Sequence, residues 1–559
     1  MLLVVSLVAS FLYGEQATTL AGNRARANML AEGGLEAVRN IRDASFTNLV
    51  DGTYYLSTSS NQWSLTSTPD NLGIFTRQIS IGTIDAKRKV VTSTVSWLQG
   101  GQQNVTISLT TLLTNWQVAT TPTAHGGMLV YSIGASSNEN MVYQTLSAAG
   151  VWSATSSMAD VSTSTTNRYA RALTLYSSNS RQEKIAISRH YNGTTQYIYS
   201  QVYNSASSSW GNVQLLSSWN ATTYLDVQNF DGTYLANGDF MALYSDNSTT
   251  TKYRIWNGTS WGAQNSINPL ATGGIPNFIV ARNRPGTNEV MVATFDQASD
   301  ANTEYFNGGT YTLTNWSGPV SHDVSAPLAT KKFVDFAWSP NNSLIGGLIY
   351  TGANSKKIGL KIFTANGSGG GTWSTAIATG VQTSNIGALD ITANPKASEF
   401  IFCDKDANTT PRIICYKSDF TPAISVPTNN TLTSNSDTGI QRSYDNAFGI
   451  NTTTAISVYS DVSTSSALLK KYNSGTVTWD SASTSIAALG ATLETVRLIP
   501  DNQSDDILIL LANTSQQLFS VFWNSASSTI YTTPVGKALV SHTGSGSADE
   551  DYWYDFTWD

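Results

Sequence analysis

Few residues in this chain have side chains that commonly do chemistry, and they are scattered. Among 559 residues there are 4 His and 2 Cys. A zinc site takes about three or four such ligands at close spacing, and the sequence contains no group of that kind. None of His125, His190, His322 and His542 lies near a nucleophile motif of the Gly-x-Ser-x-Gly type. We therefore assign no catalytic residues and expect neither a metal nor a cofactor.

Four aspartates recur at one phase of a repeated apolar strand, namely Asp246, Asp296, Asp404 and Asp461. Aspartate is a turn former, so a turn role is the simplest interpretation. The alternative is a ring of carboxylates on one face that binds cations or basic partners. A glycoside hydrolase needs two carboxylates aimed at one bond, and the spacing of the acidic residues indicates no such pair.

Cys403 and Cys415 flank the turn DANTTP, between two segments that the pattern predicts to be adjacent strands. Facing positions of a hairpin bring two Cα atoms within disulfide range. We therefore predict a cross-strand disulfide, which suits an exported protein. Charged residues make up only 12% of the chain, and the net charge is −7. Such a polar, weakly charged composition is typical of an exported bacterial surface protein, and we expect no nucleic-acid partner.

The elements that must position these residues form a repeat beyond residue 126. An apolar strand recurs with its last residues 50 to 57 positions apart, as GMLVYSIG, EKIAISRH, DFMALYSD, EVMVATFD, IGGLIYTG, EFIFCD, TAISVYSD and DILILLAN. Four strands in each such unit are typical of a β-propeller blade. The first unit lacks a leading strand, and the segment DYWYDFTWD matches the leading strand KKFVDFAWS. We predict an all-β propeller over 127–559, closed by a C-terminal strand over 551–559, with eight blades or alternatively seven.

A tryptophan follows a short polar turn near the end of most units. These blade tryptophans are Trp152, Trp210, Trp261, Trp316, Trp373 and Trp479. The turns resemble a reduced form of the Asp-box of sialidase-like propellers, without its Ser-x-Asp portion. We expect the indoles to pack between blades, with ligand stacking as the alternative.

The first 14 residues, MLLVVSLVASFLYG, are apolar and uncharged, and helical spacing continues without a break through residue 46. We predict a hydrophobic and then amphipathic helix within 1–49. Gly33 and Gly34 each cost about 1 kcal/mol relative to Ala in a helix, so they need a packing reason. A cleaved signal peptide and an ordinary membrane anchor are the alternatives. The residues expected to bury the helix against other subunits are Leu2, Val5, Leu7, Phe11, Leu12, Leu30, Val38 and Ile41.

The run LAEGGLEAVRNIRDASFTNLVDGTYYL, after a hydrophobic helix ending in YGEQATTLAGNRARA, resembles the N-terminal region of type IV pilin-like proteins of the minor-pilin or pseudopilin type. The resemblance covers residues 1 to about 116, although the leader cleavage site of that family is absent. It implies an α+β unit, in which the long helix packs on a small antiparallel β head over 50–116, before a linker over 117–126. It also implies insertion in the inner membrane, followed by assembly with copies of the chain or other pilins into a helical filament.

The sequence thus favours an extracellular filament subunit or tip adhesin without catalytic activity. Its propeller would be displayed on the cell surface to bind a surface glycan or another cell-surface ligand, and avidity along a filament would strengthen weak contacts. The second hypothesis is a surface-tethered glycan-active enzyme on a propeller scaffold. The third is a purely structural filament coat.

Overall fold

The computed structural model describes two compact units, Met1–Thr121 and Pro122–Asp559. Several short segments lie outside the described residues, among them most of the predicted linker and parts of the predicted C-terminal strand. The described residues are 2–559 without 45, 60–61, 86–87, 100–102, 115–125, 133–140, 162–168, 179, 221–226, 271–272, 324–330, 352–354, 439–441, 516 and 532–552.

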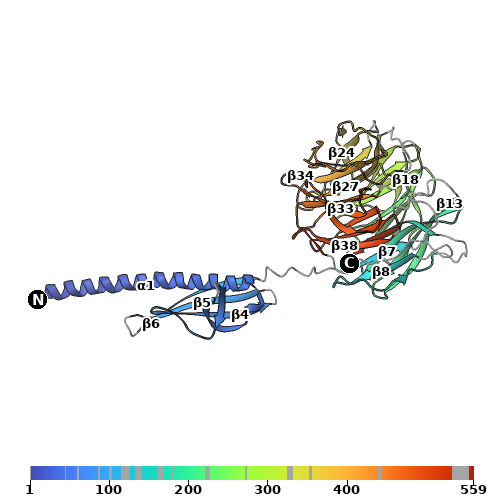
Figure 1. Ribbon diagram of the computed structural model, residues 1–559. Helices are drawn as coiled ribbons and strands as arrows, with labels where there is room; N and C mark the ends of the chain where they lie inside the picture. The colour runs from blue at the N-terminus through green and yellow to red at the C-terminus, as the bar shows by residue number, and fades with distance from the viewer. Residues whose placement is uncertain are drawn as a thin grey trace. The chain divides into compact units, whose positions relative to one another are not determined.

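The first unit is one long helix lying along a small antiparallel sheet (Figure 1). Helix α1 (Leu2–Ala44) is continuous and is followed by the 3₁₀ turn η1 (Phe46–Asn48). The sheet has the order β2-β1-β4-β5-β6, with β3 paired to β4. Its strands are β1 (Gly52–Ser59), β2 (Gln62–Thr66), β3 (Asp70–Leu72), β4 (Phe75–Asp85), β5 (Arg88–Gln99) and β6 (Gln103–Thr114).

The C-terminal half of α1 supplies the core of this unit. Ala31, Val38 and Ile41 are buried, and they pack with sheet residues such as Ile79 and Val95. An apolar helix face covering an apolar sheet face is the stable solution for so small a sheet. Val38 and Ile41, which were predicted to meet other subunits, are therefore covered by the unit's own sheet, and Leu30 is half-buried there.

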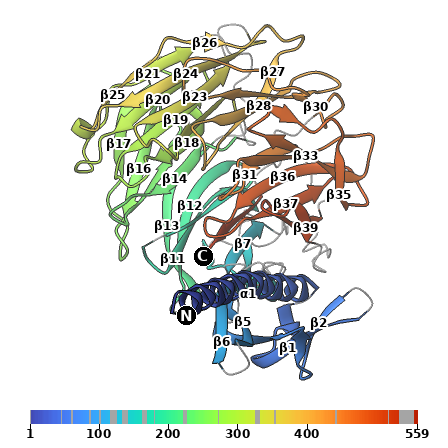
Figure 2. The same cartoon turned by 90° about the vertical axis from the view of Figure 1, so that its left-hand side faces the viewer.

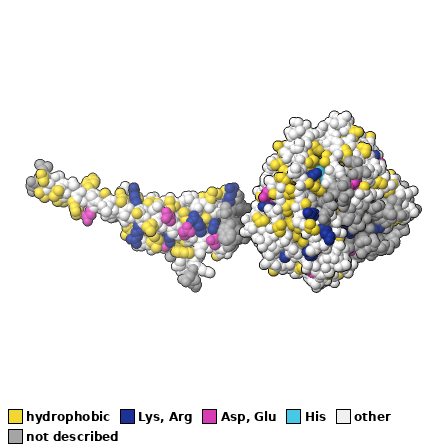
Figure 3. Space-filling model, turned by 90° about the horizontal axis from the view of Figure 1, so that it is seen from above, with side chains coloured by type: hydrophobic (Ala, Val, Ile, Leu, Met, Phe, Trp, Pro, Cys, Tyr) yellow, Lys and Arg dark blue, Asp and Glu magenta, His cyan; other side chains and the backbone are white. Residues whose placement is uncertain are grey.

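The N-terminal part of α1 contacts no other element among the described residues. Its large apolar side chains are 50–80% exposed, and they are Leu3, Val4, Val5, Leu7, Val8, Phe11, Leu12 and Tyr13. Figure 3 shows apolar side chains on the outside of the helix at this end. The side chain of Leu2 lies outside the described residues. By length and composition α1 could cross a membrane, with a mean hydropathy of 1.2 in its most apolar window.

Gly34 allows α1 to approach the sheet closely. A Cβ at this position would overlap the Oγ of Ser93 and lie 2.9 Å from the Cδ of Arg77. We expect Gly34→Ala to lower the free energy of unfolding of this unit by about 1–3 kcal/mol, as overpacking does in cores. The matched control is Gly22→Ala, where nothing lies within 4 Å and about 1 kcal/mol of stabilisation is expected from helix propensity. Chemical denaturation measures both, and equal effects at the two sites would contradict the packing role of Gly34.

The second unit consists of antiparallel sheets, of which eight are formed by the described residues. Figure 2 shows these sheets following one another around the unit, from β7 through β18 and β27 to β39. The first sheet consists of β40 (Tyr554–Trp558), β7 (Gly127–Ser132), β8 (Met141–Leu146) and β9 (Ser156–Ser157), and the second of β10 (Tyr169–Ser177), β11 (Glu183–Tyr191), β12 (Thr195–Asn204) and β13 (Ser209–Asn220). The third sheet consists of β14 (Phe230–Tyr234), β15 (Phe240–Tyr244), β16 (Thr250–Trp256) and β17 (Asn265–Pro269). The fourth consists of β18 (Pro276–Asn283), β19 (Val290–Asp296), β20 (Ala301–Phe306) and β21 (Val320–Asp323), with the 3₁₀ turn η2 (Leu313–Asn315) before β21.

The other four sheets repeat this plan of four strands in chain order, and two of them carry a fifth strand, since β26 also pairs with β24 and β35 with β33. They are β22 (Val334–Trp338), β23 (Ile345–Thr351), β24 (Ile358–Ala365), β25 (Gly371–Trp373) and β26 (Ile377–Ala378); β27 (Ile386–Ala393), β28 (Phe400–Asp406), β29 (Ile413–Ser418) and β30 (Thr431–Thr433); β31 (Tyr444–Phe448), β32 (Thr454–Tyr459), β33 (Ser466–Asn473), β34 (Thr478–Trp479) and β35 (Thr484–Ala488); and β36 (Leu493–Pro500), β37 (Asp506–Asn513), β38 (Leu518–Asn524) and β39 (Thr529–Tyr531). The arrangement is that of a β-propeller.

The second strand of each sheet is the most deeply buried. Every residue of β11, β19 and β37 is buried, because neighbouring sheets cover both faces of the strand. A strand covered on both faces is apolar throughout and does not alternate. This is why the second strands form the repeat that is visible in the sequence.

Strand β40 completes the first sheet, although it lies more than 400 residues after its partner β7. The two strands are antiparallel, with Tyr554 opposite Tyr131 and Trp558 opposite Gly127. In this position β40 takes the place that β10, β14 and the other leading strands have in their sheets. The pairing joins the two ends of the second unit without an open edge at that point.

The disulfide between Cys403 and Cys415 joins neighbouring strands of one sheet. The two residues face each other directly in the ladder between β28 and β29. Both are completely buried in the core that this sheet shares with the β31–β35 sheet. The bond therefore reinforces a pairing that the backbone already makes.

Candidate functional site

A cavity of about 340 Å³ lies where the leading strands of the sheets meet. Strands β10, β14, β18, β27, β31, β36 and β40, from seven different sheets, contribute to its wall. We call it the axial cavity. Five leading strands carry an aspartate near their middle, at Asp231, Asp335, Asp390, Asp445 and Asp555. All of the carboxyl groups in this ring except that of Asp335 line the cavity, and they give the site most of its chemistry.

Three of the five aspartates connect neighbouring sheets through the backbone. Asp555 accepts hydrogen bonds from its own neighbour Phe556 N–H and from Leu175 N–H of β10, both at 2.9 Å. Asp231 bonds in the same way to Gly232 N–H (2.9 Å) and to Ala281 N–H of β18 (2.8 Å).

Asp445 repeats this pattern with Asn446 N–H (2.9 Å) and with Leu498 N–H of β36 (2.7 Å). Each of these carboxylates is fixed by backbone donors on two strands. The first role of these three aspartates is therefore to hold the ring of sheets together.

Asp390 differs from the other members of the ring. Among the described residues its carboxyl group accepts a single hydrogen bond, from the side-chain Nδ2 of Asn446 at 2.9 Å. Burial, together with the neighbouring charge of Asp445, raises the pKa of Asp390 to about 7, and the positive charge of Lys332 opposes this effect only in part. Asp390 is thus a carboxylic acid that keeps its proton close to neutral pH and has no backbone bond to maintain.

Asp445 lies beside Asp390, because Asn446 bonds to both carboxyl groups. Burial raises the pKa of Asp445, whereas the charges of Arg442 and Arg497 oppose that effect. Two neighbouring carboxyl groups in one buried site cannot both ionise easily, so one of them holds a proton while the other remains charged. The site therefore combines a proton donor and a proton acceptor within one cavity.

The remaining charged groups balance the aspartates. Arg497 bonds to Asp555 at 2.8 Å, and Arg282 bonds to Asp231 at 3.1 Å. Lys332 forms an ion pair of 2.6 Å with Asp335. A cavity with nearly equal numbers of acidic and basic side chains suits a polar, hydroxyl-bearing ligand and disfavours an apolar or strongly charged one.

The four aspartates singled out in the sequence do not gather into a ring and do not line the axial cavity. Asp296 ends the second strand β19, and Asp246 and Asp461 follow second strands. Their carboxylates accept hydrogen bonds from nearby backbone, as in Asp296 to Ala298 N–H (2.9 Å) and Asp461 to Ser463 N–H (3.0 Å). Asp404 is buried, and burial raises its pKa to about 7 despite a hydrogen bond from Gln382. The turn interpretation holds for Asp246, Asp296 and Asp461, whereas Asp404 is a buried residue within strand β28.

The six blade tryptophans contact the sheet that precedes their own. The contacts are Trp152 with Ser520, Trp210 with Tyr143, Trp261 with the carbonyl of Asn212, Trp316 with Tyr253, Trp373 with His322, and the carbonyl of Trp479 with Asn429. These indoles fill the space between neighbouring sheets. His190 is also buried, and His125 and His542 lie outside the described residues.

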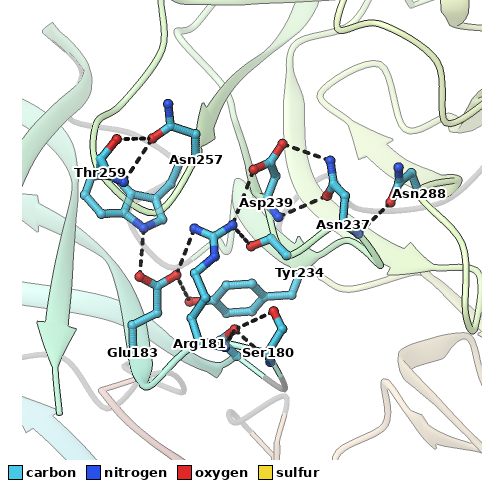
Figure 4. A network of polar contacts seen from close by, with 12 residues as sticks. Ser180, Arg181, Glu183, Tyr234, Asn237, Asp239, Asn257, Thr259 and Asn288 are labelled. Carbon is cyan, nitrogen blue, oxygen red and sulfur yellow. Dashed lines mark hydrogen bonds and ion pairs between the residues drawn. The ribbon is translucent and has the colours of Figure 1, made fainter. Parts of the chain in front are cut away.

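A second charged cluster joins the β10–β13 sheet to the β14–β17 sheet (Figure 4). Glu183 receives hydrogen bonds from the indole Nε1 of Trp256 at 3.1 Å and from the hydroxyl of Tyr234 at 3.4 Å. Arg181 lies between Glu183 and Asp239, at 3.4 and 3.3 Å. Trp256, Tyr234 and Asp239 come from the adjacent sheet, so the cluster stabilises the contact between blades. Because these groups already bond to one another, few of their hydrogen-bonding atoms remain for a ligand.

Within the described parts of the chain, no three side chains of His, Cys, Asp or Glu gather as ligands for a metal ion. The sequence-based expectation that the protein uses neither a metal nor a cofactor stays a prediction. The polar character of the axial cavity comes from the ion pairs between this chain's own aspartate, arginine and lysine side chains.

No protein-family model and no curated protein matches this chain. Solved structures that are similar to it are propellers at low identity. A putative 6-phosphogluconolactonase from Bacteroides uniformis is 12% identical with a TM-score of 0.38, covering 65% of this chain and 98% of the other. The gluconolactonase PpgL from Pseudomonas aeruginosa is 9% identical (TM-score 0.38, 65% and 97%). The propeller domain of the Trilobed protease from Pyrococcus furiosus is 8% identical (TM-score 0.36, 66% and 99%).

These likenesses concern the fold alone. The apolar N-terminal helix and the propeller are seen in the structure itself. They give no support to the terms pilus, pilin and fimbrium. The expectation that the chain is not an enzyme is corrected, because the similar structures include lactonases, a puromycin hydrolase and prolyl endopeptidases.

Proposed function

We propose that this chain is a surface-tethered, glycan-active enzyme on an eight-bladed propeller, and that the axial cavity is its active site. The observation that supports this proposal is the pair formed by Asp390 and Asp445. One member has a pKa near 7 and no backbone bond, and the other is anchored by two backbone donors. Two carboxyl groups with different environments are the equipment of glycoside hydrolysis.

In the proposed reaction Asp390 donates its proton to the oxygen of the glycosidic bond as that bond breaks. Asp445 accepts a proton from the water whose oxygen adds to the anomeric carbon. One sugar leaves as an alcohol and the other gains a hydroxyl group, so atoms and charges balance. A substrate rich in hydroxyl groups suits the charge-balanced wall of the cavity.

The test is to incubate the full-length chain in detergent with a panel of neutral and acidic oligosaccharides and to measure the new reducing ends. We expect cleavage of at least one member of the panel. Absence of cleavage across the panel, with the protein folded by circular dichroism, would overturn the proposal of hydrolysis. Release of a product without a reducing end would point to a different reaction at the same site.

We further propose that the exposed N-terminal part of α1 tethers the enzyme, first in the inner membrane and then among helices of other copies or of pilins in a filament. Its support is the uncovered apolar surface from Leu3 to Tyr13. Burying such side chains is favourable by about 1.5–3 kcal/mol each. An apolar helix surface of this size is not left in water by a stable protein.

Leu7→Lys is expected to shift the protein from the membrane fraction to the soluble fraction, because a lysine in the centre of a membrane-inserted helix costs about 2.5–3.5 kcal/mol. The control is Met29→Lys, at a side chain that is 72% exposed and lies beyond the apolar segment. Fractionation and electron microscopy for filaments would measure both variants. An unchanged distribution of the Leu7 variant would contradict the tether.

A further inference from the structure

A second pocket, of about 230 Å³, lies beside the axial cavity. It is formed by the β10–β13, β14–β17 and β18–β21 sheets and the loops next to them. Five carboxamide side chains and one indole line it, and they belong to Gln196, Asn229, Asn247, Asn277, Gln297 and Trp219. The described lining contains no charged side chain. We call this pocket the amide pocket.

The carboxamides give the amide pocket both donors and acceptors of hydrogen bonds, without net charge. Gln297 Nε2 donates to Asn277 Oδ1 at 3.2 Å, which orients both groups. Asn247 occupies the left-handed backbone region (φ 65°), and its N–H bonds to the Oγ of Ser245 at 3.2 Å. Polar groups fixed by such bonds need little rearrangement when a ligand arrives.

Asn229 supplies the observation that points to a ligand. Its side chain is only 4% exposed, and its Oδ1 has no hydrogen-bond partner in the structure. A buried acceptor without a donor costs about 1–3 kcal/mol. A hydroxyl group bound in the pocket that Asn229 lines would supply the missing donor and remove this cost.

The indole of Trp219, at the end of β13, adds a flat apolar surface to the amide groups. Sugars combine the two matching features, since a pyranose ring has an apolar face of C–H groups and a rim of hydroxyls that both donate and accept. The pocket holds about as much space as seven or eight molecules of liquid water, which suits one sugar ring. We propose that the amide pocket binds a neutral sugar residue.

The position of the amide pocket connects it with the axial cavity. Val227 and Asn229 line the amide pocket, whereas Gln228 between them lines the axial cavity. The same division occurs in β18, where Pro276 and Asn277 face one pocket and residues 278–280 the other. A sugar in the amide pocket therefore lies next to the axial cavity, because neighbouring residues of the same two segments line both pockets. Sugar binding itself does not depend on the proposed hydrolysis.

The test uses the full-length chain in detergent with glucose, galactose, mannose and N-acetylglucosamine as neutral probes and glucuronic acid as the charged probe. Saturation-transfer NMR and calorimetric titration measure binding. We expect at least one neutral sugar to bind more tightly than glucuronic acid. Trp219→Ala and Gln297→Leu should each weaken that binding about tenfold or more. Thermal melting checks that both variants are folded, and Gln297→Leu serves alone if Trp219→Ala is not.

Two control variants distinguish sugar binding in the amide pocket from effects on blade packing and from the proposed hydrolysis in the axial cavity. Trp261→Ala removes a half-buried blade tryptophan outside the pocket, and Asp390→Asn alters only the axial cavity; both should bind the sugar as the wild type does. Asp390→Asn with intact sugar binding and lost cleavage would support both proposals. Preference for glucuronic acid, no binding of any neutral probe, or unchanged binding by Gln297→Leu would overturn the amide pocket as a sugar site.

Discussion

Asp390→Asn lowers the rate of glycan cleavage by about 10²–10⁴-fold, which is the usual contribution of a general acid, and leaves the propeller folded. An asparagine has nearly the same shape and can still accept the bond from Asn446, but it cannot donate a proton to a leaving oxygen. The loss should appear in kcat with little change in KM, because the amide keeps the polar contacts of the ground state. Steady-state kinetics on the oligosaccharide cleaved by the wild type measures the effect.

The control for this substitution is Asp51→Asn in the β head, where the carboxylate pairs with Lys89 outside the propeller. Its cleavage rate should equal that of the wild type. Full activity of Asp390→Asn would refute the assignment of the proton donor, even if the axial cavity binds the glycan.

The pH dependence of cleavage provides an independent signature of Asp390. Because its pKa is raised to about 7, the wild-type rate should fall as the pH rises through about 7 and the acid loses its proton. Besides burial, the groups that set this value are Asp445, Lys332, Asp335 and the hydrogen-bonding side chain of Asn446.

The stability of the fold should also fall as the pH rises. The unfolded aspartate ionises near pH 4, whereas Asp390 in the folded protein holds its proton to about pH 7. The free energy of unfolding therefore decreases between these values as pH rises. Asp390→Asn should flatten this slope, and an unchanged slope would contradict the raised pKa.

Asp555→Ala is expected to lower the free energy of unfolding of the propeller by about 3–5 kcal/mol, the range for breaking a buried ion pair. The substitution removes the acceptor for Leu175 N–H and Phe556 N–H at the closure between the first and second sheets. It also leaves Arg497 without its 2.8 Å carboxylate partner. Urea denaturation followed by tryptophan fluorescence measures the change.

The matched control for the closure is Asp559→Ala, four residues further along. Asp559 pairs with Lys184, but its side chain is 56% exposed, so its loss should cost at most about 1 kcal/mol. Similar effects for the two variants would mean that the ring aspartates do not carry the contact between sheets.

Periodicity in the sequence was sufficient for the fold but not for the site. The second strands are apolar on both faces, so their spacing identifies the repeat, and the match of DYWYDFTWD to KKFVDFAWS identifies the strand that pairs with β7. The continuous helix followed from its apolar spacing in the same way. The apolar spacing of Val38 and Ile41 predicts that this helix face is buried, but it does not distinguish burial against another subunit from burial against the unit's own sheet.

The ring of aspartates was visible in part. Asp335 and Asp555 occupy the same place in the matching segments KKFVDFAWS and DYWYDFTWD, but the match predicts a shared strand position and not a shared carboxylate role. In the third sheet the leading strand begins at Phe230, which places Asp231 in the ring. What distinguishes Asp390 from the others is that, among the described residues, its carboxyl group accepts a hydrogen bond from a side chain and none from the backbone. A linear sequence pattern does not contain this difference.

The pairing of β40 with β7 has a consequence for the order of events in the cell. The ribosome makes the helix first, so α1 can enter a membrane while most of the propeller does not yet exist. The first sheet receives its leading strand only after more than 400 further residues have been synthesised. A product of premature termination would keep the edge of β7 exposed, and this exposed edge distinguishes it from a finished molecule for chaperones and proteases.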